Sequence, residues 1–128
     1  MSFVLSSPSA AYARVGIESG VESADAHRLI LMLFEGALVA IARAKAAMRA
    51  GDLRVKGESV SKAIQIVELG LKASLDEKAG GELALQLRSL YDYVAERLLL
   101  ASMRNEPDGL DHAAGLLGQL KQAWEEIR

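Results

Sequence analysis

The segment from Leu53 to Leu75 carries apolar side chains on two opposite faces of the helix that its periodicity predicts. At about 100° per residue, one apolar stripe is what a helix needs to face a core. The residues of that stripe are Leu53, Val60, Ile64, Val67, Leu71 and Leu75. The residues of the second set, on the side where water is expected, are Val55, Ile66, Leu69 and Ala73. A helix of a small domain has little reason to be apolar on both sides unless something covers the second one. We therefore expect a protein that holds another apolar helix.

Four long stretches of helical periodicity follow one another with short connections. The helices are expected at residues 26–49, 53–75, 82–105 and 107–127. This pattern predicts an all-α fold, an antiparallel up-and-down four-helix bundle over residues 26–128. Residues 1–25 are expected to form a flexible N-terminal segment, with a possible short helix from Ala10 to Ile17.

Residues that begin and end helices flank these stretches. Asp25 and Asp52 are suitable N-caps, because a carboxylate accepts hydrogen bonds from the free amides of the first turn. Gly51 is a suitable C-cap, and Pro107 fits the first turn of the last helix. Residues 77–81 are expected to form a loop.

The other three helices also have apolar stripes that predict their core faces. For the first helix the stripe is Ile30, Phe34, Ala37, Ile41, Ala44 and Met48. For the third it is Leu83, Leu87, Leu90, Tyr91, Val94, Leu98 and Ala101. For the fourth it is Ala113, Leu117, Leu120, Trp124 and Ile127. On the third helix, Leu85, Leu99 and Met103 lie roughly opposite the core stripe, and on the first helix Met32 and Val39 do so.

Composition excludes several classes of protein. The 128 residues include no cysteine, so a disulfide framework and a thiolate metal site are both excluded. With 15 basic and 17 acidic residues the net charge is -2, which disfavours nucleic-acid binding. The N-terminus has no basic residue before its short apolar run, and no run is long enough to span a membrane. We expect a cytoplasmic protein without membrane insertion.

Catalytic and metal-binding patterns are missing from the sequence. A di-iron bundle site needs Glu-x-x-His pairs, in which a glutamate stands three residues before each histidine. Here Ala24 stands three residues before His27, and Gly109 stands three residues before His112. Each histidine is therefore expected on the solvated surface. No nucleophile elbow and no phosphate-binding loop is present. We expect no enzymatic activity and no cofactor.

The second apolar faces allow two readings. They can form a surface for an amphipathic client helix, or a seam between two copies of the chain. Tyr93 lies off the core stripe of its helix and can line a partner surface. Periodicity alone leaves both readings open, so a homo-oligomerisation module is the alternative function.

Several short motifs, in their order and spacing, resemble the flagellar secretion chaperone family, the cytoplasmic chaperones of flagellin. Ala11-Tyr12 is followed by Val15, and residues 32–37 read Met-Leu-Phe-Glu-Gly-Ala. Residues 90–93, Leu-Tyr-Asp-Tyr, are the most specific piece, and Ala123-Trp124 closes the last helix. The resemblance covers nearly the whole chain, from Ala11 to Ile127.

This resemblance implies a chaperone that binds the disordered C-terminal segment of flagellin, prevents its premature polymerisation and assists type III export. It also implies that the export gate and an anti-sigma factor are possible partners, and we expect a monomer or a weak homodimer. The client surface is expected at Val55, Ile66, Leu69, Ala73, Leu85, Leu99 and Met103. The resemblance further implies that the N-terminal segment folds over this surface, with Tyr12 and Val15 as a lid that flagellin displaces.

Overall fold

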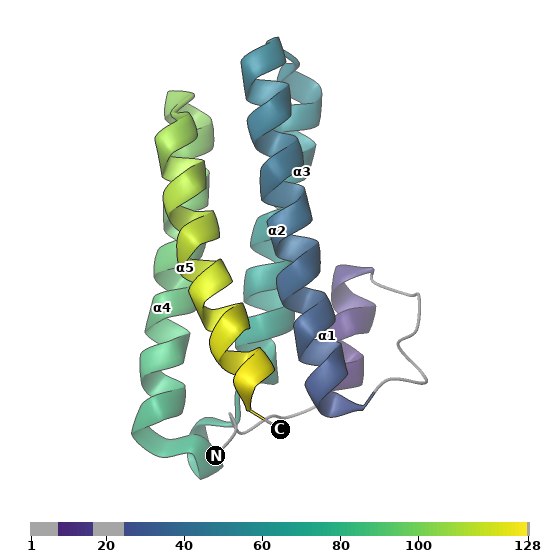
Figure 1. Cartoon of the computed structure of the whole chain (residues 1–128), viewed down its shortest axis with the longest axis vertical. Helices are drawn as coiled ribbons and strands as arrows, with labels where there is room; N and C mark the ends of the chain where they lie inside the picture. Colours follow the sequence, from purple (N-terminus) through teal and green to yellow (C-terminus); the bar gives the residue numbers. More distant parts are fainter. Residues whose placement is uncertain (1–7, 17–24, 128) are drawn as a thin grey trace.

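The computed structural model describes residues 8–16 and 25–127, and every element in them is helical (Figure 1). A short helix α1 (Pro8–Val15) precedes the long α2 (Ala26–Ala50) and α3 (Leu53–Gln65). The chain continues from α3 as a π-helix, η1 (Ile66–Leu71), and a 3₁₀ turn, η2 (Lys72–Ser74). The last helices are α4 (Glu77–Arg104) and α5 (Pro107–Glu126). The flexibility expected for the N-terminal segment concerns residues 1–7 and 17–24, which lie outside the described residues.

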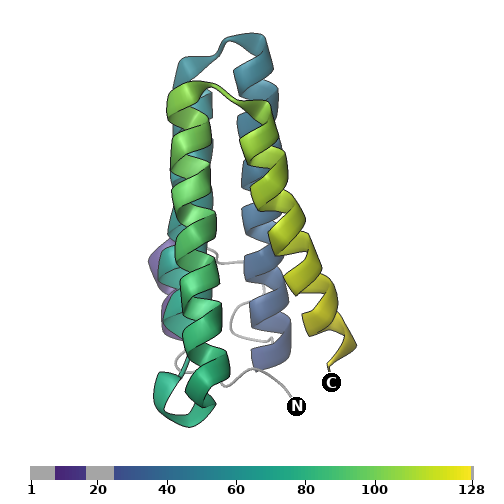
Figure 2. The same cartoon turned by 90° about the vertical axis from the view of Figure 1, so that its left-hand side faces the viewer.

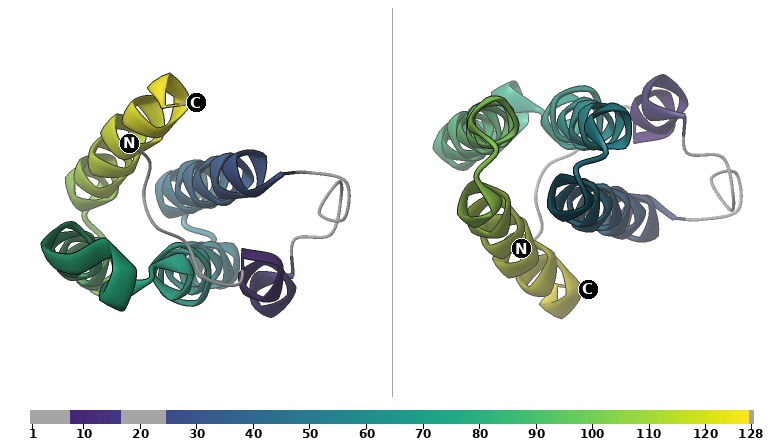
Figure 3. Two further views of the ribbon diagram at one scale, coloured as in Figure 1. Left: turned by 90° about the horizontal axis from the view of Figure 1, so that it is seen from below. Right: turned by 90° about the horizontal axis from the view of Figure 1, so that it is seen from above.

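The long helices pack in adjacent pairs. Helix α2 packs against α3 and α5, and α4 packs against α5 and α3. Figure 2 shows α4 and α5 adjacent at their shared turn and farther apart toward the C-terminal end of α5. Helix α1 lies beside η1 and α2, on the outside of the α2–α3 hairpin (Figure 3). The helical fold class is confirmed.

Three of the expected helix caps, Asp25, Asp52 and Gly51, are confirmed. The Asp25 carboxylate accepts from the Arg28 amide at 2.7 Å, and the Asp52 carboxylate accepts from the Val55 amide at 3.1 Å. Gly51, with a φ of 74°, ends α2 in the left-handed conformation that glycine adopts at low cost.

The loop expected at residues 77–81 is instead mostly helical. Asp76 caps a short turn by accepting from the Ala79 amide at 3.1 Å. Gly81 then interrupts α4 with φ 58° and ψ -135°, which separates this turn from the long helix that follows. The prediction of a loop overlooked Asp76, a good N-cap that is followed by residues compatible with a helix.

The apolar stripe predicted for α2 is buried along its whole length, and that of α4 is buried from Leu87 to Ala101 apart from the half-buried Leu90. Two leucines expected in the core are exposed, Leu53 at 68% and Leu83 at 43%. Both lie in the first turn after a chain reversal, where fewer neighbouring helices can cover a side chain.

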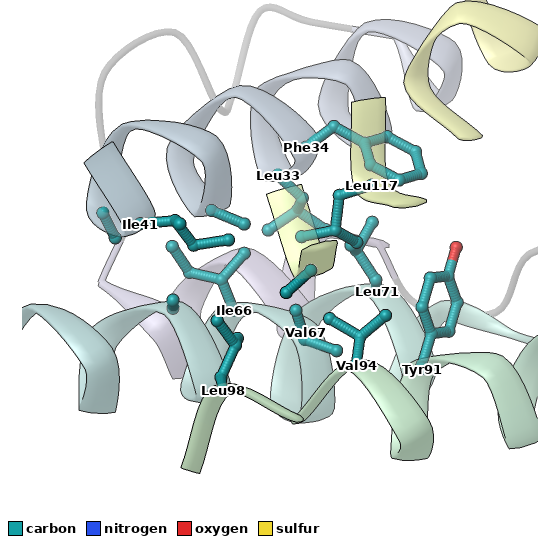
Figure 4. Packing of buried hydrophobic residues seen from close by; sticks show 14 of the residues in the cluster. Leu33, Phe34, Ile41, Ile66, Val67, Leu71, Tyr91, Val94, Leu98 and Leu117 are labelled. Atoms are coloured by element: carbon teal, nitrogen blue, oxygen red, sulfur yellow. The ribbon is translucent and has the colours of Figure 1, made fainter. Parts of the chain in front are cut away.

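The core face of the α3–η1 segment is wider than the predicted one, because Val60, Val67 and Leu71 are buried as expected but are not its only members. Ile66, expected on the far side, is 1% exposed and lies in the core near Ile41 and Leu98 (Figure 4). The buried face includes small residues that apolarity does not mark, Ser59, Ala63 and Gly70. At Gly70 an added Cβ would lie 2.9 Å from a Leu33 methyl carbon, so a larger residue here would require the Leu33 side chain to move.

The expectation of a solvated histidine is wrong for His27. Its ring stacks on Trp124 at a centroid distance of 5.0 Å, and its Nε2 lies 2.7 Å from the Trp124 carbonyl oxygen. The Trp124 indole N–H in turn donates to the His27 carbonyl at 2.9 Å. This reciprocal pair joins the first turn of α2 to the last turn of α5.

Candidate functional site

The seven residues expected to contact a client differ in their exposure. Leu69, Leu85, Leu99 and Met103 are exposed, whereas Val55 and Ala73 are half-buried. Ile66 is buried in the core, so the expectation that it faces outward is wrong. The structure thus leaves six of the predicted residues at or near the surface.

Helix α4 presents three of these residues on its outer face. Leu85, Leu99 and Met103 are separated by 14 and 4 residues, which places them on one side of an α-helix. This side is opposite the buried face that includes Leu87 and Leu98. Leu99 is 50% exposed and Met103 is 72% exposed. Helix α4 therefore offers an apolar stripe without a helix packed on it in the described part of the chain.

A small ion-pair cluster includes Asp92, which lies on the same side of α4 as this stripe, seven residues from both Leu85 and Leu99. The Lys72 ammonium donates to Asp92 of α4 at 2.7 Å and to Glu68 of η1 at 3.1 Å. These hydrogen bonds raise the pKa of Lys72 and hold the pKa of the Asp92 carboxyl below its usual value. The cluster joins η1 to α4 across the surface on which the predicted client residues are distributed.

The two residues expected to act as a lid are both buried. Tyr12 and Val15 belong to α1, which packs against η1, η2 and α2. Burial raises the pKa of the Tyr12 hydroxyl, and main-chain groups of Leu33 and Met32 near it lower that pKa in part, but no hydrogen bond of good geometry to its oxygen is formed among the described residues. A buried hydroxyl without a partner costs about 1–3 kcal/mol. Helix α1 therefore covers apolar surface with an imperfect fit.

The C-terminal end of α1 is held by a lysine from α3. The Lys62 ammonium donates to the carbonyl oxygen of Val15, the last residue of α1. A cation at this position is favourable because the carbonyl end of a helix carries partial negative charge. Gly16 follows in the left-handed conformation, with a φ of 74°.

A small pocket lies directly beyond this end of α1. It has a volume of about 90 Å³ and is lined by Ala40 and Arg43 of α2 and by Glu58, Ser59 and Lys62 of α3. Glu58 and Lys62 belong to short motifs that resemble the family, but the sequence assigned none of these five residues to a site. Arg43 and Lys62 interrupt apolar helix faces on adjacent helices, which is the one signal in the sequence that could have pointed to them.

A larger pocket, of about 600 Å³, lies where α4 turns into α5. Tyr93 and Arg97 of α4 line it together with His112 and the first turn of α5. The Tyr93 hydroxyl lies 3.0 Å from His112 Nε2, and the two rings meet edge to face. Tyr93 is thus exposed and off the core, as expected, and His112 is exposed as expected.

The described residues contain no group of three or more His, Cys, Asp or Glu side chains that could hold a metal ion. Among the helices that the structure describes, none has the length and apolarity that a membrane crossing requires. The surfaces available for function are therefore the α4 stripe, the region under α1 and the two pockets.

Comparison with known proteins gives a consistent result. The family model described as "Flagellar protein FliS" matches residues 8–128. The chain is 49% identical over 117 residues to the flagellar secretion chaperone FliS of Salmonella typhimurium, covering 91% of this chain and 87% of that protein. It is 40% identical over 116 residues to the flagellar secretion chaperone FliSB of Pseudomonas aeruginosa, covering 91% of each. The chain is 29% identical over 109 residues to the flagellar secretion chaperone FliS of Bacillus subtilis, covering 85% of this chain and 80% of that protein.

Proposed function

Since the chain belongs to the flagellar protein FliS family and is a flagellar export chaperone, we propose that its client is the C-terminal segment of flagellin. The observation that carries this proposal is the family match across nearly the whole chain. The chaperone binds the segment before assembly, prevents its premature polymerisation and assists its type III export. The role is one of binding, without a chemical reaction.

The exposed apolar surface supports binding of a segment that folds on contact. A disordered client must bury enough apolar area to offset the entropy that it loses on ordering. At about 25 cal/mol per Å², covering about 1,000 Å² of apolar surface contributes roughly 25 kcal/mol before those costs. Ordering and association consume most of this gain. An extended client that contacts several helices can reach such an area.

The proposed client surface comprises Val55, Leu69, Ala73, Leu85, Leu99 and Met103. The exposed side chains of α4 and η1 support this choice. Ile66 is left out because it packs in the core. The client is proposed to form helices on this surface and to wrap around the chaperone.

Helix α1 is proposed to act as the lid over part of the client site. The burial of Tyr12 and Val15 against η1, η2 and α2 supports this role, because client helices could take over the same apolar surface. Deleting residues 1–17 is expected to raise client affinity or to promote self-association. Unchanged affinity together with unchanged mass would reject the lid.

The remaining proposals concern the setting of the chaperone. The four long helical segments are proposed to form an antiparallel up-and-down bundle, and the protein is proposed to act in the cytoplasm. The export gate and an anti-sigma factor are proposed as further partners. The free protein is proposed to be a monomer or a weak homodimer.

The direct test is calorimetric titration of the full chain with the C-terminal segment of flagellin from the same organism, followed in parallel by circular dichroism. Micromolar or tighter binding with a gain of helix is expected. A well-folded protein that does not bind the segment would contradict the proposal.

The alternative is a homo-oligomerisation module in which the α4 stripe is the seam between copies. Mass measured against concentration separates the two functions. A monomer that captures flagellin supports the chaperone, whereas an obligate dimer indifferent to flagellin supports the module.

A further inference from the structure

Two cations, Arg43 and Lys62, line the pocket beyond α1, and neither has a carboxylate partner in the part of the chain that the structure describes. The Glu58 carboxylate is paired with Arg54 at 2.9 Å. Lys62 donates to a main-chain carbonyl, and Arg43 makes no hydrogen bond or ion pair within the described residues. The pocket wall therefore offers two positive charges, from adjacent helices, to any anionic group that enters.

The pocket is continuous with the site that α1 occupies. Lys62 belongs to both, since its ammonium holds the Val15 carbonyl and its side chain lines the pocket. Helix α1 ends at Val15, so it covers the apolar surface next to η1 but stops before the pocket. A client helix that replaced α1 and continued past this point would enter the pocket.

We propose that this pocket receives an acidic side chain of the flagellin segment, held by Arg43 and Lys62. The inference rests on the proposed function, in which flagellin displaces α1. Charge complementarity supports it, because a carboxylate is the group that a pocket with two cations in its wall favours. The contact would fix the position of the client helix along α2 and α3.

This contact also explains how a client can compete with a segment of the same chain. A tethered lid acts at high effective concentration, so the client needs interactions that the lid lacks. Lys62 donates to the end of α1 before the client binds and to the client afterwards. Its contribution therefore partly cancels between the closed chaperone and the complex. Arg43 has no partner among the described residues before binding and is engaged afterwards, so its charge favours only the complex.

Arg43→Gln in the full chain tests the proposal, with Arg49→Gln as the matched control. Arg49 is exposed on the same helix and makes no hydrogen bond or ion pair among the described residues. At low salt, Arg43→Gln is expected to weaken binding of the flagellin C-terminal segment about three- to tenfold. Arg49→Gln is expected to leave the affinity unchanged. The melting temperature and helicity of both variants should equal those of the wild type.

Salt and client variants identify the group that Arg43 contacts. The difference between wild type and Arg43→Gln is expected to shrink as salt is raised, because screening weakens the ion pair. A flagellin segment in which one acidic residue is changed to Lys should bind the Arg43→Glu chaperone more tightly than it binds the wild-type chaperone. Such a charge swap locates the partner of Arg43.

Three results would overturn the proposal. Equal affinities of the Arg43 and Arg49 variants would do so while leaving flagellin binding intact. A second such result is that the affinity difference between wild type and Arg43→Gln disappears only when the client's C-terminal carboxylate is amidated. That result would show that the pocket binds the end of the client chain instead of an acidic side chain. Failure of the wild type to bind the segment would remove this inference and the proposed function together.

Discussion

At the scale of single residues, Tyr12 shows how a buried group can hold a segment in place without holding it tightly. Its ring fills space between α1 and the helices beneath it, which favours the closed position of α1. Its hydroxyl, however, loses water without gaining a hydrogen bond from the described residues. The residue therefore combines a favourable apolar contact with a polar cost, and the balance suits a segment that must be displaced.

Tyr12→Phe is expected to stabilise the closed chaperone. Removing the unpaired hydroxyl while keeping the ring should raise the free energy of unfolding by up to about 1 kcal/mol. Because α1 is then held more tightly, affinity for the flagellin segment should fall up to about fivefold. Chemical denaturation and calorimetry measure the two effects.

The control is Tyr93→Phe, which removes an exposed hydroxyl from another surface. It should leave client affinity unchanged if α1 alone controls access. Tighter client binding by Tyr12→Phe would contradict the role assigned to the hydroxyl.

At the scale of elements, close approaches between helices occur at small residues. Gly109 of α5 faces Ala101 of α4, and a Cβ added to the glycine would lie 2.7 Å from the alanine Cβ. The two helices meet at this point just after the turn that joins them. The contact depends on the absence of a side chain, so it sets how closely α4 and α5 can pack.

Gly109→Ala is therefore expected to destabilise the protein by about 1–3 kcal/mol, because backbone must shift to make room. Gly115→Ala is the matched control on the same helix, where an added Cβ meets nothing within 4 Å. It should stabilise the helix by up to about 1 kcal/mol. Urea unfolding of both variants measures the difference, and equal effects would contradict the packing argument.

The ion-pair cluster between η1 and α4 gives a pH prediction. The pKa of Asp92 is lowered in the folded protein, so its contribution is present above its ordinary pKa of 3.8 and is lost as pH falls through the lowered value. The pKa of Lys72 is raised, so its contribution is present below its ordinary pKa of 10.5 and is lost only at higher pH. Between these limits, the contribution of this cluster to the free energy of unfolding should not change with pH.

Asp92→Asn should lower the free energy of unfolding by less than about 1 kcal/mol near neutral pH, since the pair is exposed. The deficit should disappear in acid, where Asp92 of the wild type is protonated. Denaturation curves at a series of pH values measure this convergence. A deficit that persists at the lowest pH would show that the aspartate acts through packing instead of charge.

The sequence predicted the helix ends better than it predicted the helix faces. Asp25, Gly51 and Pro107 act locally, so their chemistry identifies helix ends without knowledge of neighbouring helices. The facing of Ile66 depends on the small residues beside it, Ala63 and Gly70, which pack closely on α2. The π-helical turn from Ile66 to Leu71 also changes the angle between successive side chains, and a fixed helical period does not include that change.

At the scale of the whole molecule, exposed apolar residues are spread over several helices, and those of α4 and α2 have different expected roles. Leu85, Leu99 and Met103 form a stripe on α4, and we propose that it binds client. Val39 lies alone on the outer side of α2, at 60% exposure. Periodicity predicted the outward position of both groups, but it could not show the α1 site or the pocket beyond it. Those features arise where separate segments meet.

Leu99→Asp is expected to weaken flagellin binding at least tenfold, because it places a charge in the apolar contact. Leu53→Asp is the matched control, since it introduces the same charge at an exposed position on another helix, outside the proposed client surface and away from Arg43. Both variants should keep the melting temperature of the wild type within a few degrees. Equal losses of affinity in the two variants would contradict the assignment of the α4 stripe.

Ile66→Asp should behave differently from both. It buries a carboxylate in the core and is expected to unfold the protein. Loss of helicity in this variant, beside retained helicity in Leu99→Asp, would separate the core from the client surface.

The stacked pair of His27 and Trp124 gives the molecule a built-in optical reporter. Trp124 is the only tryptophan of the chain, and it lies where the last turn of α5 meets the first turn of α2. Its fluorescence therefore reports on that seam alone, without a label and without interference from another indole. A client that pries α5 from α2 should shift the emission toward longer wavelengths, whereas one that binds only the outer faces should leave the spectrum as it is.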